Sequence, residues 1–129
     1  MKQITLDTDE LLFQENAPAD LMYYVQKGEI QLFTVINGER KVLATIAAGD
    51  VFGELGLILG EQRSAAAAAT KPSQLVGMDR RELFARVHKD PQFAAKMVKR
   101  LAVKLHGANQ VVKEQISLRR SIEITYGKG

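Results

Sequence analysis

The stretch GDVFGELGLILGEQRSAAAAAT, residues 49–70, decides how the rest of the chain is interpreted. It places a carboxylate, Glu54, directly after a glycine, continues with an apolar run, and then sets Arg63 ahead of five alanines. A glycine and a carboxylate at the start of a short helix leave backbone N–H groups exposed, and these groups attract an anion. The stretch therefore has the residue types of a binding site for an anionic ligand.

The side chains of the stretch indicate what such a ligand contains. Glu54 would repel a bare phosphate, so it must face a group that donates a proton, such as a sugar hydroxyl. The planar, permanently charged guanidinium of Arg63 suits a phosphate. Ser64 adds a hydroxyl, and the small side chains from Ala65 onward leave room for a flat ligand. The alternative is that Glu54 and Arg63 form a surface ion pair, worth about 0–1 kcal/mol, and that the alanines form a helix.

The composition is that of a soluble globular protein with one domain. The chain has 129 residues, of which 46% are hydrophobic and 26% are charged, and this length suits one core. It has no cysteine, which excludes disulfides and thiolate metal sites. No stretch has the length and apolarity of a signal peptide or of a membrane span. A cytoplasmic protein without a membrane span is expected.

Up to residue 78, the pattern is typical of short β-strands joined by tight turns. In residues 28–46, two β-branched segments flank Asn37-Gly38, the dipeptide of a type I′ hairpin. Residues 11–28 predict a strand, a turn around Pro18 and a second strand. Short strands with tight turns favour a sandwich or a barrel.

Beyond residue 78, the apolar spacing changes to that of helices. Asp79 and Glu82 predict a capping box at the start of a short helix, and Asp90-Pro91 predicts the start of a longer one. The longer helix carries a narrow apolar seam formed by Ala94, Val98, Leu101, Leu105, Ala108 and Val112. Such a seam packs on another helix. It predicts either a homodimer through this helix or a helix that lies across its own barrel.

Positive charge gathers in the last third of the chain. Residues 96–128 hold eight basic residues against Glu114 and Glu123: Lys96, Lys99, Arg100, Lys104, Lys113, Arg119, Arg120 and Lys128. A basic stripe can contact nucleic acid or an acidic partner. A solvated helix face is the favoured interpretation.

The run Phe52-Gly53-Glu54-Leu55-Gly56-Leu57, followed by Arg63-Ser64-Ala65, resembles the phosphate-binding cassette of the cyclic nucleotide-binding domain family. The likeness covers roughly residues 8–112. It implies a mainly β fold with helices: an eight-stranded jelly-roll (double-stranded β-helix) barrel with a short cassette helix, then a hinge helix and a long C-terminal helix. One domain over residues 1–129 is expected, with the barrel in about 1–78 and the helical region and tail in 79–129. The resemblance also assigns the alanine run to a strand, against its helical propensity.

The resemblance further implies the role of each residue toward the ligand. Glu54 accepts a hydrogen bond from the ribose 2′-hydroxyl, Arg63 pairs with the cyclic phosphate, and the Ser64 hydroxyl contacts the phosphate or the base. Backbone amides around Gly53, Leu55 and Ser64 complete the cradle. The predicted ligand is a 3′,5′-cyclic nucleotide, with cAMP favoured over cGMP because serine follows the arginine. The predicted ligand-binding residues are Phe52, Gly53, Glu54, Leu55, Arg63, Ser64, Ala65 and Asn109.

Asn109 enters this set because family members cover the base from the C-terminal side. Its amide can both donate and accept, so it could contact the edge of either purine. The neighbouring Ala108 offers only packing, and its place on the apolar seam favours a dimer contact. Tyr126 is the alternative cover, if the tail folds over the ligand. Asn109 is favoured over Tyr126.

The function implied is that of a non-enzymatic sensor whose C-terminal helix shifts on ligand binding. Transcription factors of the family carry a helix-turn-helix domain after the long helix, whereas this chain ends at Gly129. We therefore expect a stand-alone module, a fragment, or a subunit that acts through a downstream protein partner, without direct DNA binding. The alternative is an interaction or structural module with a vestigial nucleotide pocket.

An enzyme is not expected from these residues. A metal-dependent barrel enzyme needs two or three histidines on its strands, and the two histidines, His88 and His106, fall in the helical half. A serine hydrolase would likewise need a histidine on the barrel as its base.

Overall fold

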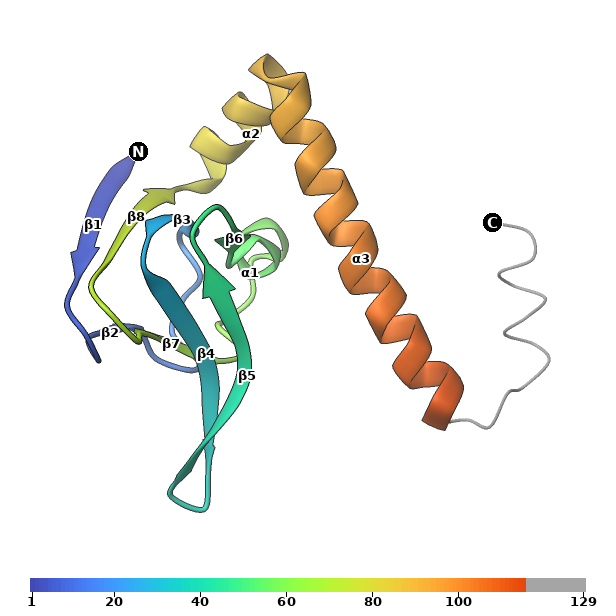
Figure 1. Ribbon diagram of the computed structural model, residues 1–129. Coiled ribbons are helices and arrows are strands. Elements are labelled where there is room, and N and C mark those ends of the chain that lie inside the picture. The colour runs from blue at the N-terminus through green and yellow to red at the C-terminus, as the bar shows by residue number, and fades with distance from the viewer. Residues whose placement is uncertain (116–129) are drawn as a thin grey trace. The chain divides into compact units, whose positions relative to one another are not determined.

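The computed structural model describes residues 1–115 of the chain, with side chains described through residue 107. Contacts divide the chain into two compact units, Met1–Ala85 and Arg86–Gly129, and each is described by itself. Figure 1 shows the strands in the first part of the chain and the long helix after them. The elements of the described residues are β1 (Lys2–Leu6), β2 (Leu11–Phe13), β3 (Met22–Lys27), β4 (Glu29–Ile36), β5 (Glu39–Ala47), β6 (Val51–Phe52), α1 (Glu54–Leu59), β7 (Ala66–Ala69), β8 (Ser73–Met78), α2 (Arg80–Lys89) and α3 (Pro91–Gln115).

The strands of the first unit form two four-stranded sheets. Their orders are β1-β8-β3-β6 and β2-β7-β4-β5, and the paired strands are antiparallel. The mainly β fold with helices is therefore confirmed, although the strands make two sheets rather than one closed barrel. Both sheets contribute to one hydrophobic core, which contains Leu6, Tyr23, Val25, Ile30, Ile46, Phe52, Ala67, Ala69 and Leu75.

The predicted hairpin of residues 28–46 is confirmed as β4 and β5. Asn37 and Gly38 have φ angles of 54° and 80°, the left-handed pair that a type I′ turn requires. The turn fixes the register, in which Ile36 pairs with Glu39 and Glu29 pairs with Ala47. The strand–turn–strand prediction for residues 11–28 is confirmed as well, by β2 and β3.

The alanine run forms strand β7, as the family resemblance implies and against helix propensity. β7 lies between β2 and β4 and pairs with both, so its four alanines are all buried. Ala67 and Ala69 belong to the core between the sheets, whereas Ala66 and Ala68 cluster with Phe33. Burial inside the sheet outweighs the intrinsic preference of alanine for helices.

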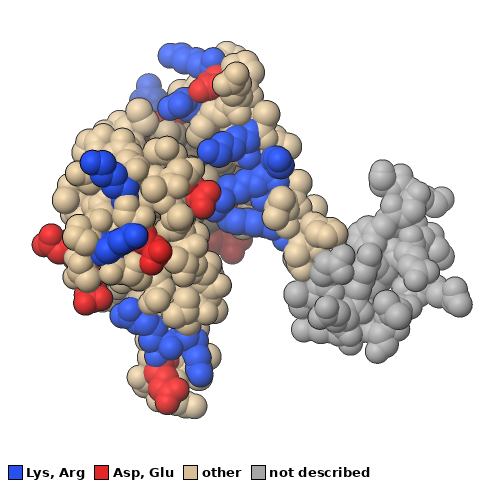
Figure 2. Space-filling view, in the orientation of Figure 1, with Lys and Arg blue, Asp and Glu red and all other residues tan. Residues whose placement is uncertain are grey.

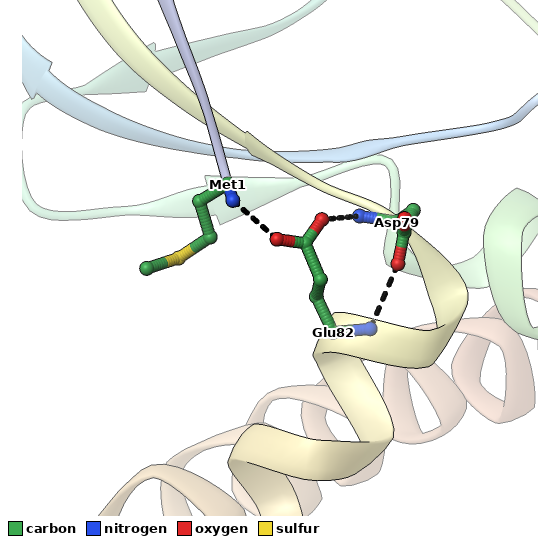
Figure 3. Close-up of polar contacts among 3 residues, drawn as sticks. All are labelled: Met1, Asp79 and Glu82. Carbon is green, nitrogen blue, oxygen red and sulfur yellow. Dashed lines mark hydrogen bonds and ion pairs between the residues drawn. The ribbon is translucent and has the colours of Figure 1, made fainter.

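The start of α2 is the predicted capping box (Figure 3). The Glu82 N–H donates to Asp79 Oδ1 at 2.8 Å, and the Asp79 N–H donates to Glu82 Oε1 at 3.0 Å. The other carboxylate oxygen of Glu82 forms an ion pair with the α-amino group of Met1. This ion pair, with the hydrogen bond from Asp79, holds the pKa of the Glu82 carboxyl below its usual value. The two reciprocal hydrogen bonds satisfy amides that the first helical turn leaves without partners.

The side chain of Asp90 caps α3, without a reciprocal hydrogen bond from the third helical residue. Its Oδ1 accepts from the Phe93 N–H at 3.1 Å, and its Oδ2 pairs with Arg86 Nε at 3.2 Å. These contacts lower the pKa of the Asp90 carboxyl, chiefly through the Phe93 amide. The predicted helix start at Asp90-Pro91 is therefore confirmed.

On α3, part of the predicted apolar seam faces solvent. Val98 and Leu105 are 66% and 64% exposed, while the side chains of Ala108 and Val112 lie outside the described residues. Basic side chains lie on the same helix, and Figure 2 shows lysines and arginines gathered along it. These residues are Lys96, Lys99, Arg100 and Lys104.

Among the described residues, none of the helices combines the length and apolarity that a membrane-spanning helix requires.

Candidate ligand-binding site

Helix α1 begins in a conformation that strongly favours glycine at its N-cap. Gly53 has φ 82° and ψ 4°, which lies in the left-handed region that other L-residues avoid. A Cβ added at Gly53 would lie 2.7 Å from Arg63 Nη1. Gly56, one turn later, allows a second close approach, because a Cβ there would lie 2.8 Å from the Ala19 Cβ. Both glycines therefore let neighbouring segments close onto the start of α1.

Glu54 and Arg63, the two charged residues predicted to bind the ligand, are both buried. The Glu54 side chain is 0% exposed at the first position of α1, and the Arg63 side chain is 5% exposed. A surface ion pair between them is therefore excluded. Removing such charges from water is costly unless they are paired and hydrogen-bonded.

The Arg63 guanidinium is anchored by two main-chain carbonyls. Its Nη1 donates to the Gly53 carbonyl at 3.2 Å, and its Nη2 donates to the Leu21 carbonyl. Among the described residues, no acceptor is in hydrogen-bond reach of the buried Nε. The guanidinium is thus tied to the start of α1 and to the segment before β3, and its Nε edge has no partner there.

Two aromatic rings, those of Phe13 and Tyr23, contact this guanidinium, and Phe52 packs against both of them; we call these three residues the aromatic cluster. The Arg63 Cζ lies 4.3 Å from the Phe13 ring centroid and 5.6 Å from that of Tyr23. The Tyr23 ring stacks on Phe52 at 5.2 Å and on Phe13 at 5.9 Å between centroids. Both contacts of Arg63 are within the range of cation–π attraction.

Burial shifts the pKa of the two polar groups in this contact. Burial lowers the pKa of the Arg63 guanidinium from its ordinary value, and the nearby Tyr23 and Asp20 partly oppose that shift. Burial raises the pKa of the Tyr23 phenol, and the positive charge of Arg63 partly opposes it.

The backbone of Arg63 is fixed by the loop between β2 and β3. The Arg63 N–H donates to the Ala17 carbonyl at 2.8 Å, and the Asn16 N–H donates to the Arg63 carbonyl at 2.8 Å. Pro18 and Gln62 form an antiparallel bridge next to these bonds. The predicted turn around Pro18 therefore also holds the arginine in place.

The other predicted ligand-binding residues divide into three groups. The Phe52 side chain is 2% exposed within the core, so only its backbone can face a ligand. Leu55 and Ser64 are exposed, and Ala65 is buried at the start of the alanine run. Asn109 falls on α3, but its side chain lies outside the described residues, as does the whole of Tyr126.

Sequence reasoning missed the residues that hold Arg63. Phe13, Tyr23 and the Leu21 carbonyl contact its guanidinium, yet they precede it by about 40 residues or more. Tyr23 lies on β3 and is 5% exposed, and the sequence pattern alone gave it no role at the site. Only the pairing of β2 with β7 and of β3 with β6 brings these rings beside the arginine.

The described residues contain no group of three or more His, Asp or Glu side chains that could hold a metal ion. His88 lies on α2 and His106 lies on α3, as the sequence predicted. The polar groups brought together at the start of α1 are instead an arginine and a glutamate.

Comparison with known proteins places this arrangement in a family. Residues 3–90 match the family model of the cyclic nucleotide-binding domain. This chain belongs to that family. It carries a cyclic nucleotide-binding domain, and the cassette segment, residues 52–65, lies within the matched range.

Individual relatives agree with this assignment. The cyclic AMP receptor protein of Thermus thermophilus is 29% identical over 99 residues, which are 76% of this chain and 46% of that protein. The crystal structure of the catabolite activator protein of Thermus thermophilus superposes with a TM-score of 0.79 at 24% identity, covering 88% of this chain and 54% of the other. The regulatory domain of Toxoplasma gondii PKA, crystallised with cAMP, gives a TM-score of 0.61 at 27% identity, covering 65% of this chain and 32% of that one. The chain thus spans less than half of the receptor protein's length.

Proposed function

We propose that this cyclic nucleotide-binding domain binds a 3′,5′-cyclic nucleotide at the cassette segment, prefers cAMP to cGMP, and acts as a non-enzymatic sensor. The observation that carries the proposal is the buried guanidinium of Arg63, held at the start of α1 by the carbonyls of Gly53 and Leu21. A buried cation is stabilised by an anion placed against it. α1 has six residues and sums few peptide dipoles, so Arg63 is the main positive charge there. The Toxoplasma gondii regulatory domain crystallised with cAMP supports this class of ligand.

Each residue of the cassette segment then has one role. Arg63 pairs with the cyclic phosphate, and Glu54 accepts a hydrogen bond from the ribose 2′-hydroxyl. The backbone amides of Gly53 and Leu55 add donors at the start of α1. The exposed hydroxyl of Ser64 contacts the phosphate or the base, while the small Ala65 leaves room for the ligand beside the strand.

The output of the sensor is a change in the position of its C-terminal helix. The ligand binds one arrangement of cassette and helix better than another, and so shifts the population between them. Asn109 closes over the base in the favoured arrangement. The exposed Val98 and Leu105 on α3 support a homodimer through this helix, and they would equally serve an interaction module with a vestigial pocket.

Calorimetric titration separates the sensor from the vestigial module. The protein is first unfolded and refolded to remove any co-purified nucleotide, and is then titrated with cAMP, cGMP and cyclic di-GMP. We expect saturable binding of cAMP, weaker binding of cGMP and none of cyclic di-GMP. Absence of binding by both mononucleotides would mean that the pocket is vestigial.

The same titration tests the role of Glu54. In a double-mutant cycle, Glu54→Ala and removal of the 2′-hydroxyl from cAMP should have strongly non-additive effects on the affinity. Additive losses would mean that the carboxylate does not contact the ribose. A 2′-deoxy ligand that binds wild-type protein as well as cAMP does would have the same meaning.

A further inference from the structure

Some N–H donors of the Arg63 guanidinium have hydrogen-bond acceptors in the protein, and others do not. An arginine has five N–H donors, two on each Nη and one on Nε. One donor of Nη1 is used by the Gly53 carbonyl, and one donor of Nη2 is used by the Leu21 carbonyl. The buried Nε has no acceptor among the described residues. Leaving a buried donor without an acceptor is unfavourable, so this arrangement calls for a partner on the Nε edge.

The face of the guanidinium is also occupied. The Phe13 ring centroid lies 4.3 Å from Cζ, and Phe13 stacks in turn on Tyr23, whose ring stacks on Phe52. Phe13 comes from β2, while Tyr23 and Phe52 come from the paired strands β3 and β6. Rings fixed by two sheets restrict the rotation of the guanidinium, because turning it would break both the ring contacts and the carbonyl bonds.

We propose that Phe13 is a positioning residue for Arg63: with the carbonyls of Gly53 and Leu21, it fixes the guanidinium so that the Nε edge meets the ligand phosphate. A phosphate binds side-on to Nε–H and the adjacent Nη–H, in the two-point geometry that arginine favours with oxyanions. The aromatic cluster thus acts on affinity without contacting the ligand. This inference rests on the proposed function for the identity of the anion.

We expect Phe13 to affect the affinity for cAMP only by positioning Arg63. Phe13→Leu keeps an apolar side chain of similar volume but removes the ring face, and should weaken cAMP binding up to about 30-fold, the size of a desolvated cation–π contact. Phe13→Tyr keeps the ring and should bind within about twofold of wild type. In an Arg63→Lys background, Phe13→Leu should have little further effect, because a lysine has no planar group to stack.

The ¹H–¹⁵N signal of the Arg63 Nε–H group reports the geometry directly. In the ligand-free protein, it should show an upfield ring-current shift that is lost in Phe13→Leu and kept in Phe13→Tyr. Saturation with cAMP should move it downfield, as expected when Nε–H donates to a phosphate oxygen. Inorganic phosphate serves as the second probe, because it offers the same oxyanion without the nucleoside.

The outcomes distinguish this inference from the proposed function. If phosphate binds and moves the Nε–H signal but cAMP does not bind at all, the positioning role stands and the cyclic nucleotide proposal fails. The positioning role is wrong if cAMP binds without moving the Nε–H signal. Equal losses of affinity from Phe13→Leu in the wild-type and Arg63→Lys backgrounds would also overturn it, because Phe13 would then act through the fold. If neither probe moves the signal or binds, both proposals are wrong.

Discussion

At the residue scale, Gly53 meets two demands at once. Its backbone has φ 82°, and a Cβ there would lie 2.7 Å from Arg63 Nη1. The first demand concerns the stability of the fold, and the second concerns the position of the arginine. Substitutions at Gly53 and Gly38 can separate the cost of the positive φ from the effect on the arginine. Gly38 also has a positive φ, of 80°, but nothing lies within 4 Å of a Cβ added there.

We therefore expect Gly53→Ala and Gly38→Ala to lower the free energy of unfolding by similar amounts, about 1–2 kcal/mol each. Only Gly53→Ala should also weaken cAMP binding, by tenfold or more, because its Cβ displaces the end of the Arg63 side chain. Urea unfolding and calorimetric titration of both variants check this. Gly53→Ala protein that binds cAMP as tightly as Gly38→Ala protein would contradict the account.

Tyr23 gives a prediction about alkaline pH. Burial raises the pKa of its phenol in the folded protein, whereas the unfolded chain titrates near the ordinary value of about 10. The folded state therefore holds the proton more tightly, and stability falls as pH rises from the unfolded pKa through the folded one. Urea unfolding between about pH 8 and 11 should show a shallower decline for Tyr23→Phe than for wild type. Equal slopes would show that Tyr23 makes no such contribution.

At the element scale, the capping box of α2 is the clearest local determinant. Asp79 accepts from the Glu82 amide, and Glu82 accepts from the Asp79 amide (Figure 3). Asp79→Ala should lower the free energy of unfolding by about 1 kcal/mol. Asp7→Ala is a matched control, since the exposed Asp7 carboxylate has no hydrogen bond in the described part of the chain. Equal stability of the two variants in urea unfolding would argue against the cap as a determinant of α2.

The elements also show what the sequence can and cannot predict. The hairpin at Asn37-Gly38 and the starts of α2 and α3 depend on residues within a few positions of one another, so their signals are local. The strand at Ala66–Ala69 is different, because its own residues favour a helix. Its assignment came from the family resemblance, and its cause is pairing with β2 and β4 on both sides.

At the site, too, some residues could be predicted from their neighbours in the sequence, whereas others depend on which distant strands pair. The cassette segment supplied Gly53, Glu54 and Arg63, whose residue types indicate an anion and a hydroxyl. The burial of Arg63 against Phe13 and Tyr23 could not be predicted, because it depends on which strands pair. The role of Asn109 was predicted from the family resemblance alone, and its side chain lies outside the described residues.

At the scale of the whole molecule, charge is segregated along the chain. Residues 1–85 hold eight lysines and arginines against twelve aspartates and glutamates, whereas residues 86–129 hold ten against three. The last part of the chain therefore attracts anions in general, and this attraction depends on the salt concentration. Binding measurements must be made at constant ionic strength, because exposed charges are screened by salt.

The proposed movement of α3 gives the prediction at this scale. If Asn109 closes over the base, cAMP should slow amide hydrogen exchange across residues 100–115. Asn109→Ala should weaken cAMP binding and reduce this protection. Hydrogen exchange followed by mass spectrometry, with and without cAMP, measures both effects. Unchanged affinity together with no ligand-induced protection of this segment would rule out the helix as a lid.

The most direct test of the central claim is the affinity of Arg63→Ala for cAMP. If the cyclic phosphate binds against the buried Arg63, as proposed, truncation of this side chain should cost about 2–5 kcal/mol, or roughly 30-fold to several-thousand-fold in affinity. Arg81→Ala removes an exposed arginine and should leave the affinity unchanged. Arg63→Lys keeps a charge and checks the result if Arg63→Ala does not fold, with an intermediate loss expected. Calorimetric titration in which folded Arg63→Ala or Arg63→Lys protein binds cAMP as tightly as wild type would contradict the account.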